Sequence, residues 1–295
     1  MTSPSLPSHS ATSDMSFERT VLSELQMTQA QYPIATTVDE FTRLEIQADL
    51  FREDARAMLA RIGDGAGRRV LDLCCGIGGI TDVLSAWVGA TGHVIGADLD
   101  VAKLDRARTW ARQQQLTNVD FIEANAFDSG LPLQSFDLVH SRFAISVIEN
   151  GLGILDHMLQ LVRPDGWVFV EEANTHTMQC VPTNQDWEHA LALMKQTFQV
   201  VGADTELGPS LRGAFLDRGL APLVVKPCLH ALTAQDPMTL HLPMTLASMT
   251  ETITSHGLME AGALEALVAR LADHLAKPET MTISYSMIQV VGRAA

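Results

Sequence analysis

Asp72-Leu73-Cys74-Cys75-Gly76-Ile77-Gly78-Gly79 is the stretch of sequence that decides the fold. It ends a short apolar strand predicted at Val70–Cys74 and opens a helix predicted from about Gly79 to Val88. A strand that runs through a glycine-rich bend into a helix presents backbone N–H groups and a helix N-terminus to a ligand. Gly76 and Gly78 have no side chain, so a ligand can approach the backbone closely. A tight strand–helix turn without a ligand needs glycine too, so the run alone leaves both interpretations open.

An acidic residue at the end of the next strand favours a ligand. Asp98 ends the second predicted strand, 20 residues after Gly78. An acid at this place and distance accepts hydrogen bonds from both hydroxyls of a ribose. Asp98 could instead cap the following helix, but Asp100 suits the cap better and leaves Asp98 for the ligand. A dinucleotide fingerprint would need glycine or alanine where this chain has Thr81, and it would not explain Asp72 inside the first strand.

Short apolar strands alternate with helices along the middle of the chain. Strands are predicted at Val70–Cys74, Val94–Ala97, Val119–Glu123, Phe136–His140 and Trp167–Glu171. Helices are predicted at about Gly79–Val88, Val101–Gln114 and Gly153–Val162, the last of them stopped by Pro164. Alternation of this kind implies a parallel sheet covered on both faces.

The segments on either side of this alternation have patterns of their own. Thr37-Val38-Asp39-Glu40 is typical of a capping box, with Thr37 as N-cap and Glu40 at N3, and predicts a helix that Gly63 ends. Beyond Glu172, helices are predicted at Asp186–Val201, Gly208–Arg218 and over most of Ala234–Ala276, with a strand at Leu223–Leu229. Met281, Ile283, Tyr285 and Met287 alternate with threonine and serine, which predicts an antiparallel strand with one face less buried.

The composition excludes several classes of protein. The chain has 295 residues, 46% of them hydrophobic, which is typical of a globular protein with a buried core. Its formal net charge of −15 repels a phosphate backbone, so nucleic acid is not expected as a substrate. The dense basic cluster is predicted to be a solvated helix face and consists of Lys103, Arg106, Arg108 and Arg112. No apolar run approaches the roughly 20 residues that span a bilayer, so no membrane partner is expected.

The cysteines and the N-terminal stretch indicate a reduced, cytoplasmic protein. The four cysteines are Cys74, Cys75, Cys180 and Cys228. No pair of them has metal-ligand spacing, so neither a metal nor a structural disulfide is expected. The stretch Met1–Ser16 is rich in serine, threonine and proline and lacks the basic start and apolar core of a signal peptide.

Several stretches resemble the motifs of class I S-adenosylmethionine-dependent methyltransferases, in the order and spacing of that family. Val70–Gly79 is similar to the family's first motif, Gly96–Asp98 to its second, Asn125–Phe127 with Leu131–Pro132 and Ser135–Val139 to its adenine-side loop and fourth strand, and Leu161–Gly166 to the turn before its fifth strand. The resemblance covers about Val70–Glu172. It implies an α/β fold with a Rossmann-like doubly wound sheet of about seven strands, mostly parallel with an antiparallel last strand, and a helical cap.

The resemblance also implies S-adenosyl-L-methionine as the cofactor. The cofactor-binding positions that it marks are Asp72, Cys74, Gly76, Gly78, Asp98, Leu99, Asn125, Ala126 and Phe127. Ser141 and Arg142 follow the fourth strand and are further candidates, with Arg142 expected to pair either with the cofactor carboxylate or with an acid of the substrate. The acid at Asp72 would lie close to the ammonium group of the methionine moiety. Three residues depart from the family's pattern: Cys74 stands where glycine is usual, Asn125 where aspartate is usual, and Asp165 at a turn glycine. An amide oxygen can still accept a hydrogen bond from the adenine amine, so Asn125 is expected to bind.

Methyl transfer to an oxygen or nitrogen that bears a proton benefits from a general base. His140 lies at the carboxyl end of the fourth predicted strand, where ligands bind in such sheets, and Glu172 or Glu171 ends the fifth. Because strand side chains alternate, only one of the two glutamates should face the pocket, and we name His140 and Glu172 as catalytic candidates. A more distant likeness to small-molecule methyltransferases of the ubiquinone/menaquinone-biosynthesis and natural-product type marks substrate candidates. They are Tyr32, Gln47, Asn174, His176 and Trp187.

The expected organisation follows from these patterns. We predict a disordered tail at 1–20, an N-terminal helical cap segment at 21–66, a cofactor-binding core at 67–175, helical insertions with strand six at 176–278, and a last strand at 279–295. The expected partner is a small-molecule substrate, and a homodimer is an assembly that the sequence leaves open. The function implied is methyl transfer to oxygen, nitrogen or an activated carbon. Two alternatives remain: a cyclisation or rearrangement that keeps the cofactor, and a non-catalytic ligand-binding protein on the same fold.

Overall fold

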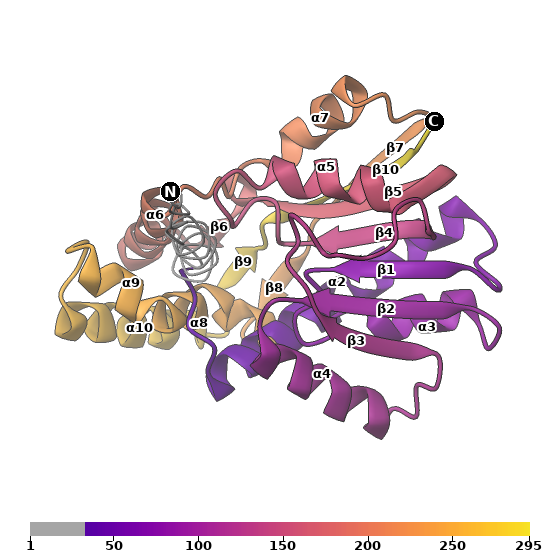
Figure 1. Ribbon diagram of the computed structural model, residues 1–295. Coiled ribbons are helices and arrows are strands. Elements are labelled where there is room, and N and C mark those ends of the chain that lie inside the picture. The colour runs from indigo at the N-terminus through magenta and orange to yellow at the C-terminus, as the bar shows by residue number, and fades with distance from the viewer. Residues whose placement is uncertain (1–32) are drawn as a thin grey trace, which may run out of the picture.

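A computed structural model describes residues 33–295, and it contains a central sheet with helices on both faces (Figure 1). The sheet has seven strands in the order β3-β2-β1-β4-β5-β10-β7. In chain order they are β1 (Arg69–Leu73), β2 (His93–Asp98), β3 (Val119–Glu123), β4 (Phe136–Arg142), β5 (Val162–Asn174), β7 (Leu223–Cys228) and β10 (Ser286–Arg293). The strands β1 to β5 are parallel, and β10 lies antiparallel between β5 and β7. The predicted Rossmann-like doubly wound sheet, mostly parallel with an antiparallel last strand, is therefore confirmed.

Two layers of helices bury the two faces of the sheet. The helices are α2 (Val38–Ile62), α3 (Thr81–Val88), α4 (Val101–Gln113), α5 (Leu152–Leu161) and α7 (Leu211–Asp217). On one face α2 and α3 pack on a cluster that includes Val70, and on the other α5 and α7 pack on a cluster that includes Leu71 and Leu73. Side chains of a strand point to alternate faces, so β1 buries Val70 under one layer of helices and Leu71 and Leu73 under the other. The helix α4 packs against β2 and β3.

The helix α2 begins and ends where the sequence predicts. The side-chain oxygen of Thr37 accepts a hydrogen bond from the backbone N–H of Glu40, which confirms Thr37 as the N-cap. At the other end, the N–H of Gly63 donates to the carbonyl of Leu59, and Gly63 has a φ of +108°. The carboxylate of Glu40 turns to Arg43, with which it forms a buried ion pair. The N-terminal half of α2 is thus available to cover the end of the sheet.

A second, mainly helical body lies beyond the end of the sheet at which β5 finishes (Figure 1). Its elements are η1 (Thr175–Thr177), β6 (Gln179–Val181), α6 (Gln185–Val200), β8 (Ala231–Thr233), η3 (Pro237–Leu240), α8 (His241–Ser248), α9 (Thr250–Ser255), α10 (Ala261–Leu275) and β9 (Met281–Ile283). The short helix η2 (Gly208–Ser210) packs instead against β5, β10 and α7. The short strands form a three-stranded sheet in the order β6-β9-β8. Trp187, Leu246 and Leu271 belong to one apolar cluster here, which also includes Phe51 of α2. This body and α2 together cover the open end of the main sheet.

The stretch from Met281 to Met287 differs from its prediction. It is divided between two sheets, because β9 pairs with β6 and β8, whereas β10 begins at Ser286 and pairs with β5 and β7. The expectation of one less buried face is wrong for β10, which lies inside the sheet and is buried up to Gly292 except for the half-buried Ile288. It holds for β9, where Met281 is exposed and Thr282 is buried. Strand β5 is also longer than predicted at both ends.

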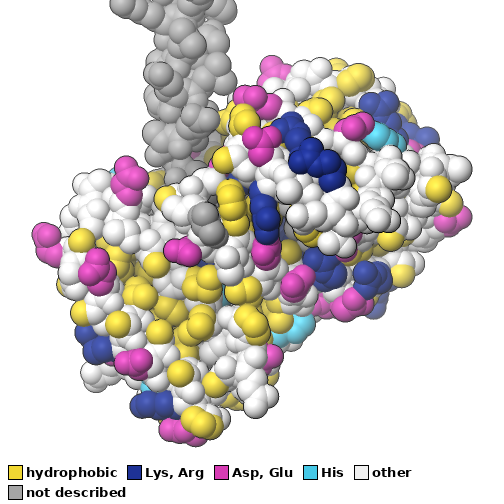
Figure 2. Space-filling model, turned by 90° about the horizontal axis from the view of Figure 1, so that it is seen from below, with side chains coloured by type: hydrophobic (Ala, Val, Ile, Leu, Met, Phe, Trp, Pro, Cys, Tyr) yellow, Lys and Arg dark blue, Asp and Glu magenta, His cyan; other side chains and the backbone are white. Residues whose placement is uncertain are grey.

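The prediction that the basic cluster on α4 is a solvated helix face holds for Arg106, Arg108 and Arg112, but it is wrong for Lys103, which is buried and lines the cavity described below. Arg106 pairs with Glu45, Arg108 with Asp105, and Lys103 lies near Asp100. Figure 2 shows basic side chains interspersed with acidic ones on this side of the molecule. Among residues 33–295, no helix is both long enough and apolar enough to cross a membrane.

Candidate functional site

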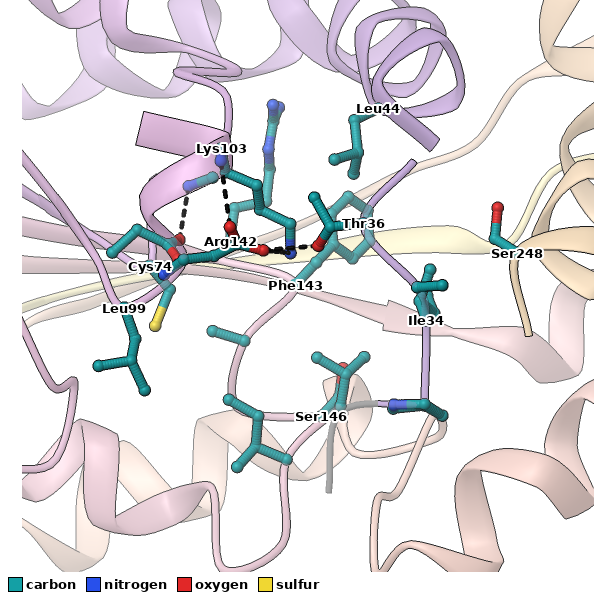
Figure 3. Close-up of a pocket in the computed structure, with 18 of the residues that line it drawn as sticks. Ile34, Thr36, Leu44, Cys74, Leu99, Lys103, Arg142, Phe143, Ser146 and Ser248 are labelled. Carbon is teal, nitrogen blue, oxygen red and sulfur yellow. Dashed lines mark hydrogen bonds and ion pairs between the residues drawn. The ribbon is translucent and has the colours of Figure 1, made fainter. Parts of the chain in front are cut away.

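A cavity of about 840 Å³ opens at the carboxyl ends of β1, β2 and β4 and extends beneath α2 and α8. Figure 3 shows its two ends. The glycine-turn end is lined by Cys74, Gly76, Asp98, Leu99, Asn125, Ala126 and Phe127. The α8 end is lined by Ile34, Leu44, Gln47, Phe143, His241, Ser248 and Tyr285. Arg142 lies between the two ends (Figure 3).

The glycine turn after β1 adopts backbone conformations that favour glycine. Gly76 and Gly78 have φ angles of +54° and +85°, and Cys74 has a φ of +61°. A residue with a side chain is strained by roughly 1–2 kcal/mol in this region, which accounts for the glycine that the resembling family has where Cys74 stands. Burial, followed by the charges of Asp98 and Asp72, raises the pKa of the Cys74 thiol well above its ordinary value. The thiol therefore stays protonated and gives the cavity an uncharged surface at this point.

Asp98 joins the glycine turn to the end of β2. Its Oδ2 accepts a hydrogen bond of 2.8 Å from the N–H of Gly76, and its Oδ1 accepts one of 2.9 Å from the N–H of Asp100. Burial raises the pKa of Asp98, and the charge of Lys103 opposes that shift. Asp100 caps α4 by accepting hydrogen bonds from the N–H groups of Ala102 and Lys103. The prediction that Asp100 and not Asp98 is the N-cap is therefore confirmed. Asp98 keeps lone pairs for a ligand in the cavity.

The loop after β3 forms another part of the glycine-turn end. The Oδ1 of Asn125 accepts a hydrogen bond of 2.9 Å from the N–H of Phe127, which folds the loop into an Asx turn. Asn125, Ala126 and Phe127 all line the cavity. A carbonyl oxygen has two lone pairs, so Asn125 can hold the loop and accept a second hydrogen bond.

Arg142 brings a positive charge to the middle of the cavity. An ideal Cβ on Gly79 would lie 2.6 Å from the NH2 atom of Arg142, so a side chain at Gly79 would displace the guanidinium from this position. Its NH1 atom is buried and has no hydrogen-bond partner among residues 33–295. A buried guanidinium N–H without an acceptor is costly unless a ligand completes it. Ser141, the neighbouring prediction, is buried and does not line the cavity.

The predicted base His140 lies behind the cavity wall, in a buried polar chain. Its Nδ1 is 2.8 Å from Oδ1 of Asp72 and its Nε2 is 3.1 Å from Oε1 of Glu171. Burial lowers the pKa of His140, but the hydrogen bonds and charges of Asp72 and Glu171 outweigh it and raise the pKa overall. Gln289 of β10 donates to the other oxygen of Glu171. His140 therefore forms a hydrogen bond with each of two carboxylates. Neither His140 nor Asp72 lines the cavity.

Glu172, the other catalytic candidate, shapes the loop after β4. Its Oε1 accepts from the N–H groups of Ala144 and Ile145 at 3.0 and 2.8 Å, and its Oε2 accepts from the hydroxyl of Ser146. Burial raises the pKa of Glu172 to about 7, although these hydrogen bonds oppose the shift. Glu172 is fully buried and does not line the cavity, whereas Ala144 and Ser146 do. Both glutamates are thus buried, on opposite faces of β5.

The substrate candidates are dispersed in the structure. Gln47 lines the cavity. Asn174 caps η1, and the exposed His176 pairs with Glu206, so both have other roles in the structure. Trp187 lies in the core of the second body, where its indole N–H has no acceptor among residues 33–295. Tyr32 lies outside the described residues.

No motif in the sequence marks Phe143, His241 and Tyr285 as residues of the α8 end. Tyr285 belongs to the alternating stretch that was interpreted only as a strand, and His241 to a long helical region without a recognisable motif. Phe143 follows Arg142 and has a φ of +53°, which no local pattern indicates. They lie together only because three distant segments pack there.

The comparisons with known proteins agree with this geometry. A family model described as a methyltransferase domain matches residues 64–212, just over half of the chain, and the chain belongs to this family. A demethylmenaquinone methyltransferase of Lactococcus lactis subsp. lactis (strain IL1403) is 33% identical over 132 residues, which cover 45% of this chain and 51% of that protein. The chain spans about half the length of the curated relatives it matches.

Solved structures show a related fold. The YcgJ protein of Bacillus subtilis has a TM-score of 0.54 and 16% identity, and the match covers 81% of this chain and 96% of that chain. A protein of Bacillus halodurans C-125 has a TM-score of 0.55 and 14% identity over 81% of this chain and 97% of that chain. At this identity the likeness concerns the fold alone.

His140→Gln should destabilise the protein by about 3 kcal/mol at pH 6, because it leaves one buried carboxylate without a donor. The raised pKa of His140 means that its contribution is present below the ordinary value of 6.5 and is lost as pH rises through the folded value. Burial favours the protonated form of Glu171, but His140 and Arg142 lower its pKa, so its contribution is lost as pH falls below 4.5. The difference from wild type in urea unfolding should therefore be largest between about pH 4.5 and 6.5.

His157→Gln is the matched control, since the buried ring of His157 faces Ser129 and Gln160 and no carboxylate. An unfolding difference for His140→Gln that follows the same pH profile as this control would contradict the role of the two carboxylates.

Glu172→Gln should remove a pH dependence of stability. The folded pKa of about 7 lies above the ordinary 4.5, so ionisation of Glu172 costs the wild type roughly 3 kcal/mol as pH rises from 4.5 to 7. The amide keeps an oxygen for the N–H groups of Ala144 and Ile145, so the variant should gain stability relative to wild type between pH 5 and pH 8. Glu172→Ala should be less stable at every pH, because it leaves these N–H groups unpaired. If the free energy of unfolding changed with pH equally in the wild type and in Glu172→Gln, the raised pKa of Glu172 would be contradicted.

Proposed function

We propose that this chain is an S-adenosylmethionine-dependent methyltransferase that acts on a small molecule, at oxygen, nitrogen or an activated carbon. Its membership of the methyltransferase-domain family and its likeness to demethylmenaquinone methyltransferases support this proposal. The observation that carries it is the carboxylate of Asp98, which lies at the end of β2 beside the glycine turn and faces the cavity. In this position Asp98 can accept from the two hydroxyls of a ribose.

The residues of the glycine-turn end fit S-adenosylmethionine. Gly79 leaves room for the guanidinium of Arg142, whose buried NH1 lacks a partner among the described residues and suits the carboxylate of the methionine moiety. Leu99 and Phe127 provide an apolar wall for the adenine ring, and Asn125 offers it a polar group. When bound, the cofactor supplies an electrophilic methyl group on a sulfonium ion. The backbone turn at Gly76 lets the ligand approach Asp98 without a side chain in the way.

The side chains of this chain position the acceptor and exclude water rather than remove its proton. His140 and Glu172 lie behind the wall of the cavity, and each already serves other polar groups. Placement in a dry cavity lowers the barrier of a displacement reaction by fixing the reacting atoms in line. This mode of action suits an acceptor that is already nucleophilic when bound.

Asp98→Ala should weaken the binding of S-adenosylhomocysteine by roughly 1–3 kcal/mol, because the ribose hydroxyls lose their acceptor. Asp98→Asn keeps an oxygen for the N–H of Gly76 and should weaken binding less. Asp105→Asn is the control, since Asp105 is an exposed residue of α4 that pairs with Arg108. Isothermal titration calorimetry measures all three, and thermal unfolding checks that they fold.

An unchanged dissociation constant in Asp98→Ala would show that another residue binds the ribose. Tight binding of NAD without binding of S-adenosylmethionine would refute the proposed function. Formation of S-adenosylhomocysteine with an acceptor present separates methyl transfer from a reaction that only keeps the cofactor bound.

A further inference from the structure

Three polar side chains meet at the α8 end of the cavity, away from the glycine turn. Gln47 comes from α2, His241 from the start of α8, and Tyr285 from the link between β9 and β10. The Nε2 of Gln47 is 2.7 Å from the hydroxyl of Tyr285 and 3.4 Å from Nε2 of His241. All three side chains are buried and line the cavity. The proposed contacts with the cofactor use none of them.

The proton positions in this cluster follow from Arg43. A guanidinium can only donate, and the NH1 of Arg43 lies 2.8 Å from Nε2 of His241. That nitrogen must therefore be the unprotonated acceptor of a neutral ring. Burial, followed by the charge of Arg43, lowers the pKa of His241 well below its ordinary value, in agreement with a neutral ring. His241 cannot take a proton from a substrate while Arg43 occupies its lone pair.

The same logic orients Gln47 and then Tyr285. The end of Gln47 that faces the acceptor nitrogen of His241 must be its NH2 group. This group also donates to the oxygen of Tyr285, so the hydroxyl of Tyr285 accepts from Gln47. No acceptor among residues 33–295 receives the hydroxyl proton of Tyr285. The proton is thus available to a ligand in the cavity.

The ring of Tyr285 is held firmly in place. It stacks on Phe51 with ring centres 5.4 Å apart, and it packs edge-on against Phe143 and His241 at 5.5 Å each. Burial raises the pKa of Tyr285, so the phenol stays protonated. A fixed, protonated phenol is a directional donor that costs little to order on binding.

On the basis of the proposed methyl transfer, we propose that Tyr285 donates a hydrogen bond to an oxygen atom of the methyl acceptor, and that this acceptor is a mainly apolar molecule carrying a carbonyl or ionised hydroxyl group. Ile34, Leu44 and Phe143 give the α8 end apolar parts of its wall (Figure 3), and the hydroxyl side chains of Thr245 and Ser248 lie beside them. The apolar parts of the wall suit a hydrocarbon frame, and the directed O–H of the firmly packed Tyr285 fixes the orientation of that frame. Arg43 lies behind the cluster but is paired with Glu40, so it is the O–H of Tyr285 itself that favours an oxygen bearing negative charge.

The test compares two probes of similar shape, 1-tetralone and tetralin, of which only the first has a carbonyl oxygen. Calorimetry is performed with S-adenosylhomocysteine at saturation, so that the probes enter the α8 end. The wild type should bind 1-tetralone roughly tenfold more tightly than tetralin, and Tyr285→Phe should lose that preference. The carbonyl stretch of ¹³C-labelled 1-tetralone should lie at lower frequency in the wild type than in Tyr285→Phe.

Thr245→Val is the matched control. Thr245 also lines the cavity, but its hydroxyl donates to the carbonyl of His241 within α8, so its proton is not available. This variant should keep the preference for the ketone and the shifted carbonyl stretch.

An isosteric probe tests the phenol without changing the packing. The chain has two tyrosines, so in a Tyr32→Phe background fluorotyrosine enters only position 285. The more acidic fluorinated phenol is a stronger donor and should lower the carbonyl frequency further. An equal frequency with both phenols, or a ketone preference that survives in Tyr285→Phe, would overturn the inference.

The two proposals fail in different ways. Titration with S-adenosylhomocysteine alone tests the proposed function, and no binding there would refute it. The carbonyl frequency is measured with S-adenosylhomocysteine bound, so normal nucleotide binding with an unshifted carbonyl would refute only the role of Tyr285.

Discussion

His140 has a carboxylate at each ring nitrogen, and the middle of the sheet is built around this arrangement. Asp72 of β1 lies opposite His140 of β4, and Glu171 of β5 lies opposite Gln289 of β10. The residues two places away on these strands, such as Val70 and Phe169, belong to the cluster beneath α2 and α3. A shift of one residue in any of these strands would leave a charge buried without its partner, at a cost of several kcal/mol. The polar chain therefore fixes the register just below the cavity.

Local patterns predicted the parts of the fold that depend on neighbouring residues. The glycine turn, the cap at Asp100 and the ends of α2 are set within a few residues of chain, and the structure has them where the sequence indicates. The end of the chain was harder to predict because period-two alternation does not reveal where a strand leaves one sheet for another. A strand between two others, with helices on both faces, can also bury serine and glutamine, as Ser286 and Gln289 show.

The two ends of the cavity also differ in how far their residues lie apart in the sequence. The glycine-turn end comes from one continuous region, so its residues could be predicted from motif spacing. At the α8 end, Gln47 and Tyr285 are 238 positions apart in the chain, and only the completed fold brings them together. His140 was predicted as a base because it was expected to end its strand, yet β4 continues to Arg142 and leaves His140 below the wall. Arg142 is instead the last residue of β4, and its side chain lines the cavity.

The position of β10 between β5 and β7 has a consequence for the order in which the molecule is completed. β7 is synthesised before β10 but joins the main sheet only through it. Until β10 emerges from the ribosome, β7 has no partner in the main sheet and the edge of β5 is open. Glu171 also lacks Gln289 until then, and Tyr285 is not yet beside Gln47. Because domains fold largely as their chain emerges, the last step of sheet assembly and the completion of the cavity are a single event.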